Sequence, residues 1–183
     1  MGFRKLETSI PDLFIIQPDI FGDDRGFFME LFNHNSFSHI GLGHLNFVQD
    51  NLSSSVKGTL RGMHFQKPPA AQGKLVVALQ GSVLDMVVDL RKNSPTFGQH
   101  YAKILDSTTK TMMYVPEGFA HGFQVLSDTC LFFYKCTSLY QKDSEGGIAW
   151  DDPDLQLPWA NIPPVISEKD KQHLPFARFD SPF

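Results

Sequence analysis

Two histidines, His64 and His121, stand in short segments rich in glycine and apolar residues, GTLRGMHFQ and VPEGFAHGF. Two cations accompany the first segment: Arg61 lies within it and Lys74 follows it in the sequence. Zinc sites use three or four protein ligands, so two histidines alone rarely hold a metal ion, and a nearby lysine repels one. Histidine, lysine and arginine without a metal indicate acid–base chemistry on an anionic substrate.

Short strands must position these side chains, because helical periodicity is scarce. Strand-like runs, separated by clusters of Gly, Pro, Asn and Asp, cover residues 13–17, 27–32, 47–51, 59–66, 75–79, 82–90, 100–105, 111–115, 122–126 and 131–137. One short helix is expected near residues 35–40. Short strands at this spacing predict a β-sandwich or barrel.

The run 82–90 predicts how one strand divides its faces. Its odd positions carry Asp85 and Asp89 between valines, and its even positions are largely apolar. Because side chains alternate along a strand, one face should pack in a core and the other should line a cavity. The proline-rich C-terminal tail predicts an extended strap, with a short helix that has Ser167 as its N-cap and Asp170 at its third position.

The composition argues against several functional classes. The 183 residues include 16 Lys and Arg against 20 Asp and Glu, a net charge of -4, which disfavours a nucleic-acid surface or a polybasic membrane anchor. The apolar runs are far shorter than the ~20 residues that span a bilayer. The N-terminus has no apolar signal segment. Cys130 and Cys136 lie in one predicted strand, too far apart to bond. We therefore expect reduced thiols and a single cytoplasmic domain over residues 1–183.

The segments around His64 and His121 resemble the two motifs of the cupin superfamily. The pattern P-x-G-x-x-H matches the second motif, and G-x5-H matches the start of the first. Metal cupins take two His and a Glu from the first motif and a third His from the second, whereas Gln66 and Lys74 stand at two of these places here. The resemblance implies an all-β, cupin-like jelly-roll or β-sandwich barrel with a few short helices and no bound metal.

An ordered set of segments is similar to the dTDP-4-dehydrorhamnose 3,5-epimerase family. These segments are 21–28, 47–51, 60–66, 72–76, 89–91, 94–98, 116–123, 134–135, 148–153 and 167–170. The resemblance implies an isomerase of deoxysugar biosynthesis that needs no cofactor. It would invert C3 and C5 of dTDP-4-keto-6-deoxyglucose and give dTDP-4-keto-rhamnose. It also implies a homodimer, and the runs 13–16 and 27–32 are apolar enough to pair with, or reach into, a second subunit.

The resemblance implies catalytic roles for four residues. His64 would take a carbon-bound proton, since an imidazole is mostly neutral near pH 7. Asp170 would hold His64 in the right tautomer and stabilise its cation. Lys74 would stabilise the enolate oxygen at C4. Tyr134 would return a proton to the opposite face, because inversion needs groups on both faces.

The resemblance also implies a larger set of substrate-binding residues. This set comprises Arg25 and Arg61 on the diphosphate, Gln49, Asn51 and His121 around the sugar, Phe28 and Tyr140 as stacking partners for thymine, and Glu30 and Glu145. Arginine suits the diphosphate because its guanidinium binds phosphate oxygens in a bidentate way. Asp85 is expected to orient a neighbour such as His121. The plain alternative is that Asp85 or Asp89 forms an ion pair with Arg91 or Lys103.

Three other readings of the sequence stay open. The protein could invert only C3 or only C5 of a related dTDP-4-keto-6-deoxysugar. It could be a metal cupin, although the residues at positions 66 and 74 argue against that. It could also bind a nucleotide sugar without catalysis, which would leave the pairing of His64 with Asp170 without a purpose.

Overall fold

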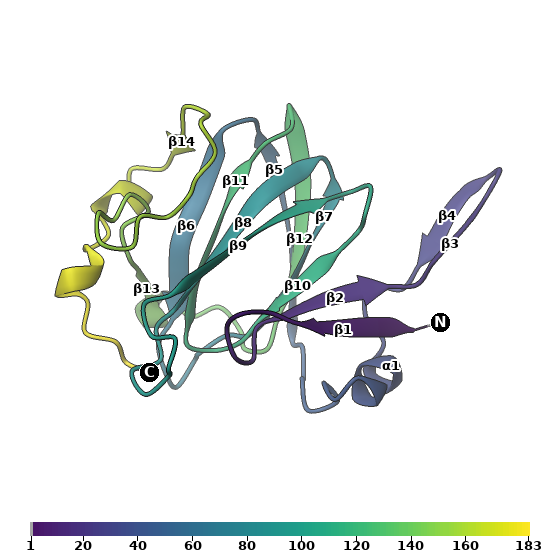
Figure 1. Ribbon diagram of the computed structural model, residues 1–183, viewed down its shortest axis with the longest axis horizontal. Helices are drawn as coiled ribbons and strands as arrows, with labels where there is room; N and C mark the ends of the chain where they lie inside the picture. The colour runs from purple at the N-terminus through teal and green to yellow at the C-terminus, as the bar shows by residue number, and fades with distance from the viewer. Residues whose placement is uncertain (1) are drawn as a thin grey trace.

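Two β-sheets face each other in the computed structural model, which describes residues 2–183 (Figure 1). The strands are β1 (Phe3–Glu7), β2 (Phe14–Pro18), β3 (Ile20–Asp23), β4 (Gly26–Met29), β5 (Gln49–Val56), β6 (Thr59–Gln66), β7 (Lys74–Gln80), β8 (Ser82–Asp89), β9 (His100–Asp106), β10 (Met112–Val115), β11 (Phe119–Val125), β12 (Thr129–Cys136), β13 (Glu145–Gly147) and β14 (Val165–Ile166). The helices are α1 (His34–His39) and the 3-10 turns η1 (Lys142–Ser144), η2 (Asp170–Gln172) and η3 (Phe176–Arg178). No helix within residues 2–183 has the length and apolar character needed to cross a membrane.

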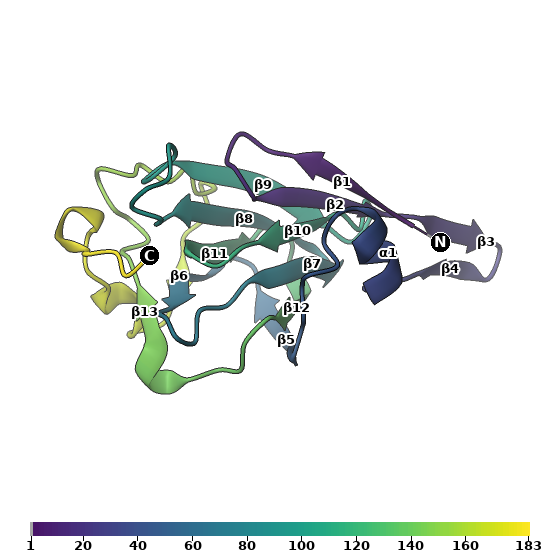
Figure 2. The ribbon, with the colours of Figure 1, turned by 90° about the horizontal axis from the view of Figure 1, so that it is seen from below.

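The sheets are mostly antiparallel. One has the strand order β1-β2-β10-β7-β12-β5, and the other has the order β13-β6-β11-β8-β9 with β14 pairing β6 in parallel. The β3–β4 hairpin forms its own small sheet and projects from the body, while the C-terminal tail lies at the opposite end (Figures 1 and 2). Cys130 and Cys136 on β12 are both free. This architecture confirms the expected all-β, cupin-like sandwich.

Apolar side chains fill three layers. Val83 and Val87 of β8 point between the sheets, whereas Met86 and Val88 point outward beneath the C-terminal tail. This alternation is the two-residue period of a strand, and it places the odd face of β8 toward the interior. Both faces pack in apolar layers and no residue of β8 lines the cavity between the sheets, so the expectation that one face lines a cavity is wrong. The outer face of the other sheet is covered by α1, which buries Phe37 completely.

Several strands differ from the sequence-based prediction. β1, β3, β13 and β14 were not expected, and the predicted strand 27–32 ends at residue 29 in a hairpin. β5 runs on to Val56, beyond the predicted end of this strand at residue 51. Its backbone groups pair with β12 along the whole strand, so pairing with a neighbouring strand extends it.

Asp89 is the buried acceptor at the end of β8, and it carries one stability prediction. Its carboxylate accepts hydrogen bonds from Arg91 at 2.8 and 2.9 Å, from Ser94 at 2.6 Å and from Thr96 at 2.7 Å. Burial alone would raise the pKa of Asp89, but these partners outweigh it and lower the pKa. Asp89→Asn should lower the free energy of unfolding by about 3 kcal/mol at neutral pH, because it breaks a buried ion pair. The loss should not be larger, because Arg91 keeps its ion pair with Asp12.

The pH dependence of this loss has a definite sign. An aspartate with a lowered folded-state pKa stabilises the fold above its unfolded pKa, and the contribution disappears as pH falls through the folded pKa. Urea unfolding of wild type and Asp89→Asn should therefore differ fully at pH 7 and converge in acid. A constant difference down to pH 2 would contradict this assignment.

Candidate active site

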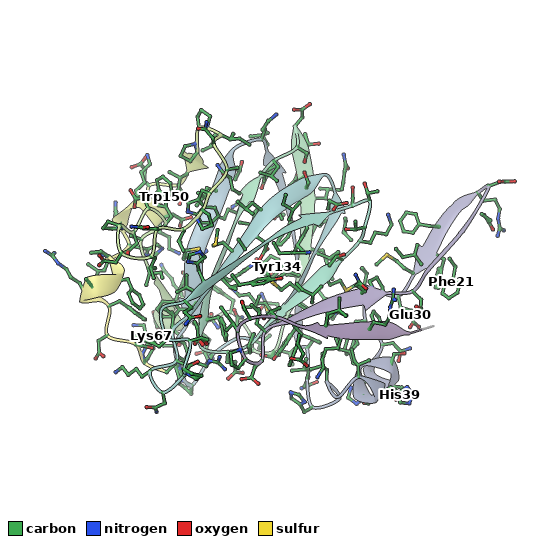
Figure 3. All side chains as sticks on the ribbon, viewed as in Figure 1. Phe21, Glu30, His39, Lys67, Tyr134 and Trp150 are labelled. Carbon is green, nitrogen blue, oxygen red and sulfur yellow. The ribbon has the colours of Figure 1, made fainter. Side chains whose placement is uncertain are left out.

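A cavity of about 640 Å³ opens between the sheets and is lined from β6, β7, β11, β12 and the tail segment that leads into η2. A second cavity of about 290 Å³ adjoins it, and both share His64, Lys74 and Tyr134. Tyr134 lies inside the sandwich in Figure 3. These cavities bring together all four residues that the sequence indicated as catalytic.

His64 and Asp170 form a hydrogen-bonded pair at the cavity wall. His64 Nε2 lies 2.9 Å from Asp170 Oδ1, and the backbone N–H of Gly62 donates to Asp170 Oδ2 at 3.3 Å. Ser167 Oγ accepts from the backbone N–H of Asp170 at 3.1 Å, but the expected helix is wrong, because the 3-10 turn begins only at Asp170 and has Lys169 as its N-cap. Burial alone would raise the pKa of Asp170, but the hydrogen bond and charge of His64 outweigh it and lower the pKa. The carboxylate thus stays ionised and stabilises an imidazolium.

Lys74 begins β7 and faces the same cavity from the opposite sheet. Its ammonium has no hydrogen-bond or ion-pair partner within residues 2–183. Burial lowers the pKa of Lys74, and the charges of Cys136, Asp85 and Glu145 oppose this shift. A cation held free of protein partners in a partly dry cavity is suited to stabilise a developing oxyanion.

Tyr134 lies on β12, beside Lys74 of β7. The register pairs Tyr134 with Val76 and Cys136 with Lys74, so Tyr134 and Lys74 lie on one sheet face. Burial raises the pKa of Tyr134, and Cys136 adds to this shift while Arg61 opposes it. The phenol therefore keeps its proton at neutral pH, as a proton donor must.

His121 pairs with His64 across β11 and β6 and is itself held by a second carboxylate. Its Nε2 lies 2.9 and 3.0 Å from the two oxygens of Asp85, which is fully buried. Burial raises the pKa of Asp85, and His121 and Lys74 oppose the shift. The expected orienting contact is present, and His121 stacks on Phe132 with ring centroids 6.5 Å apart.

Four of the indicated substrate-binding residues line the adjoining cavity, Gln49, Asn51, Tyr140 and Glu145. The Gln49 amide donates to Asn51 Oδ1 at 2.9 Å and accepts from the backbone N–H of Tyr140 at 2.8 Å. The Tyr140 hydroxyl donates to Glu145 at 2.9 Å. Arg61 lines the main cavity, and its guanidinium donates a hydrogen bond to the Ser55 hydroxyl at 3.3 Å. This wall offers amides, an aromatic ring and a cation within reach of one elongated ligand.

Within one chain, the other indicated substrate-binding residues do not line either cavity. These are Arg25, Phe28 and Glu30. Arg25 and Phe28 lie on the projecting β3–β4 hairpin, and within residues 2–183 Arg25 forms an ion pair only with Asp23, at 2.5 Å. Figure 3 shows Phe21 and Glu30 at the hairpin end of the molecule, far from Tyr134. These three residues can contact a ligand in the cavity only if the cavity belongs to another copy of the chain.

Two residues beside the site were missed by the sequence analysis. Lys169 lines the main cavity and forms an ion pair of 2.6 Å with Glu145. His173 lies beside the histidine–aspartate pair, with its ring centroid 5.6 Å from that of His64. Lys169 precedes Asp170 directly, so the segment 167–170 already held the signal for it. His173 had no such signal, because only the fold brings η2 against β6.

The fold is a cupin-like sandwich with one main cavity. Two histidines held by carboxylates, a buried lysine and a protonated tyrosine surround this cavity. This combination defines a class of protein that catalyses proton transfer. The sequence profile described as dTDP-4-dehydrorhamnose 3,5-epimerase matches residues 7–178. The chain is 48% identical to the dTDP-4-dehydrorhamnose 3,5-epimerase of Pseudomonas aeruginosa over 179 residues, covering 97% of this chain and 98% of that protein. The chain belongs to the dTDP-4-dehydrorhamnose 3,5-epimerase family.

Solved structures agree with this assignment. A dTDP-6-deoxy-D-glucose-3,5-epimerase from Legionella pneumophila, in complex with dTDP-4-keto-L-rhamnose, is 44% identical, covers 98% of this chain and 95% of its own, and has a TM-score of 0.93. A 3'-monoepimerase from Streptomyces bikiniensis, in complex with dTDP-quinovose, is 34% identical, covers 97% and 88%, and has a TM-score of 0.88. The fold is therefore shared by enzymes that differ in the number of carbons inverted.

Proposed function

We propose that this chain inverts C3 and C5 of dTDP-4-keto-6-deoxyglucose by cofactor-free proton transfer beside the C4 ketone. The observation that carries the proposal is the placement of the two proton-handling groups on opposite sheets. His64 projects from β6, and Tyr134 projects from β12 into the same cavity. Inversion requires removal of a proton from one face and its return to the other.

His64 acts as the base. Its Nε2 is held by Asp170, so its Nδ1 carries the free lone pair that takes the proton from the carbon. The electron pair left on the carbon delocalises onto the C4 oxygen and gives an enolate. The negative charge on Asp170 stabilises the imidazolium, as in other histidine–carboxylate pairs.

Lys74 and Tyr134 complete the step. The ammonium of Lys74 stabilises the enolate oxygen, and the stabilisation is larger in a dry cavity than in water. Tyr134 donates its phenolic proton to the opposite face of the carbon and recovers a proton from solvent. The imidazolium of His64 releases its proton to solvent, and the same sequence at the second carbon then completes the double inversion.

The partner we propose is a second copy of the chain, whose β3–β4 hairpin reaches the cavity of its neighbour. Phe27 and Phe28 on this hairpin are more than half exposed, and one carboxylate oxygen of Glu30 is buried without a hydrogen-bond partner within residues 2–183. Two-fold dimers are the commonest oligomers. Such a dimer would deliver Arg25 to the substrate diphosphate.

Mixing two inactive variants tests this arrangement. Arg25→Ala and His64→Asn should each be inactive or nearly so as homodimers. If the hairpin acts on the neighbouring cavity, a mixed dimer carries one intact site, so unfolding and refolding an equimolar mixture should restore about a quarter of wild-type activity. Recovery near zero, with mixed dimers verified by mass spectrometry, would place Arg25 with the cavity of its own chain.

Tyr134→Phe separates proton removal from proton return. The ring packs as before, but the donor is lost, so inversion should slow by about 10²-fold, the lower range for general acid catalysis. Exchange of the carbon-bound proton with heavy water should slow much less, because His64 is intact. The ratio of exchange to inversion, followed by NMR, should rise well above that of wild type. An equal loss in both rates would argue against Tyr134 as the acid.

The product decides between this proposal and a mono-epimerase. Proton–proton couplings around the sugar ring report the configuration at C3 and C5 after incubation with dTDP-4-keto-6-deoxyglucose and a chelator. We expect inverted couplings at both carbons. Inversion at one carbon would support the mono-epimerase alternative, and binding with no change would support the non-catalytic one.

A further inference from the structure

Three potential metal ligands meet beside the cavity, and none of them corresponds to the missing places of the cupin metal motif. Ligand atoms of His64, Asp170 and His173 all lie within 4.8 Å of one another. Asp170 Oδ1 lies 2.9 Å from His64 Nε2 and 4.0 Å from His173 Nε2. The set contains two imidazoles and one carboxylate, which are ligands typical of zinc.

His173 is held in this position by the backbone rather than by a polar partner. The Leu174 carbonyl accepts from the N–H of Ala149 at 2.9 Å, and a bridge joins Ile148 to Leu174. The ring packs over Gly147, where an added Cβ would clash with His173 Nε2, and the β13–β6 register sets Gly147 opposite His64. The Nε2 atom is buried and has no hydrogen-bond partner within residues 2–183.

An unpartnered buried nitrogen is costly, so its environment points to a ligand that supplies a bond. The open side of the cluster is the cavity, because both His64 and Asp170 line it. A cation can therefore enter through the substrate's own route, and a water molecule from the cavity can complete four-coordination. Mg²⁺ prefers oxygen ligands and octahedral geometry, so this set discriminates against it.

We propose that His64, Asp170 and His173 form an inhibitory zinc site. Zinc–nitrogen bonds of about 2.0–2.1 Å place tetrahedral ligand atoms about 3.3 Å apart, between the two separations above. Small rotations of the two imidazole rings bring all three atoms to that spacing. Asp170, the least exposed of the three, contacts both histidines and bridges the set.

The inhibition rests on the proposed function, in which Nδ1 of His64 is the base. Zinc bound at Nε2 replaces the hydrogen bond to Asp170 and leaves the ring's single proton on Nδ1. That nitrogen then has no lone pair to accept a proton from the sugar, and Asp170 is occupied by the metal. Zinc binding and proton abstraction therefore exclude each other.

Calorimetric titration of the metal-free protein with ZnCl₂ tests the site without reference to activity. We expect one zinc ion per chain for wild type, and affinity weaker by roughly 10- to 100-fold for His173→Asn, at least the effect of losing a supporting contact in a metal site. His39→Asn is the matched control, because His39 lies on α1 at the far side of the molecule (Figure 3). His173→Leu serves as a second variant that lacks the ligand. Thermal unfolding of each variant shows whether it is folded, so that weaker zinc binding is not mistaken for a folding defect.

Activity assays complete the test. ZnCl₂ should inhibit wild type and His39→Asn, EDTA should reverse the inhibition, MgCl₂ should have no effect, and His173→Asn should keep its basal rate while resisting zinc. Equal zinc affinity in wild type and both His173 variants would overturn the site, and one-to-one binding without inhibition would overturn the inhibitory role. If zinc binds as expected but the metal-free wild type shows no epimerisation, the proposed function fails and the binding site stands.

Discussion

His64→Asn should reduce kcat for epimerisation by about 10³- to 10⁴-fold while leaving substrate affinity within a few-fold of wild type. General base catalysis contributes about 10²–10⁴, and disrupting a histidine–carboxylate pair of this kind costs up to about 10⁴. The backbone N–H of Gly62 still donates to Asp170, so the buried carboxylate keeps a partner and the fold is preserved. The rate is measured by NMR of the sugar protons, and the affinity by calorimetry with dTDP.

Asp170→Asn is the companion variant for this prediction. The carboxamide keeps the size of the side chain but removes the charge that stabilises the His64 imidazolium, so a similar loss is expected. The double variant should be little worse than either single one, because the two residues act as a unit. Activity of His64→Asn within tenfold of wild type would exclude His64 as the base.

Lys74→Met should lower kcat by about 10²- to 10³-fold, the effect of removing one oxyanion-stabilising group. Methionine keeps most of the apolar stem, and the ammonium has no partner among the described residues 2–183 that its removal would leave unpaired. Loss of the buried cation should therefore leave stability nearly unchanged, or raise it. The variant is checked by kcat and by urea unfolding together.

The pH profile gives this prediction a second readout. Burial lowers the pKa of Lys74 below that of a free lysine, so its positive charge is lost as pH rises through that lowered value. Wild-type kcat should fall on the alkaline side earlier than an exposed lysine would allow, while Tyr134, whose pKa is raised, is still protonated. Lys74→Met should show no such alkaline fall. An unchanged alkaline limb in the variant would assign it to another group.

The local parts of this site follow from sequence patterns, whereas its long-range contacts do not. The alternation in 82–90 predicted the strand β8 and its division into two faces, and the P-x-G-x-x-H pattern marked His121. Pairing of His64 with Asp170 spans 106 residues, so it came from family resemblance and not from any local period. The contact of Lys169 with Glu145 is likewise a product of the tail folding back on the sandwich.

The β3–β4 hairpin shows a different limit of prediction from sequence. Arg25 and Phe28 stand in a family-like segment, so sequence similarity grouped them with the cavity residues. A single chain places them on a projecting β3–β4 hairpin (Figure 1). Sequence similarity reports what a position contacts in the assembled protein, and it cannot say which copy of the chain makes the contact. The extension of β5 to Val56 shows a related effect, since pairing with β12 decided the length of the strand.

Deuterium incorporation is the most direct test of proton transfer at the two carbons flanking the ketone. The metal-free protein is incubated with dTDP-4-keto-6-deoxyglucose in heavy water, and C3 and C5 are followed by NMR beside a His64→Asn control. We expect deuterium at both carbons with wild type and at neither with the variant. Absence of exchange at both carbons with wild type, although the nucleotide sugar binds, would contradict the proposed chemistry.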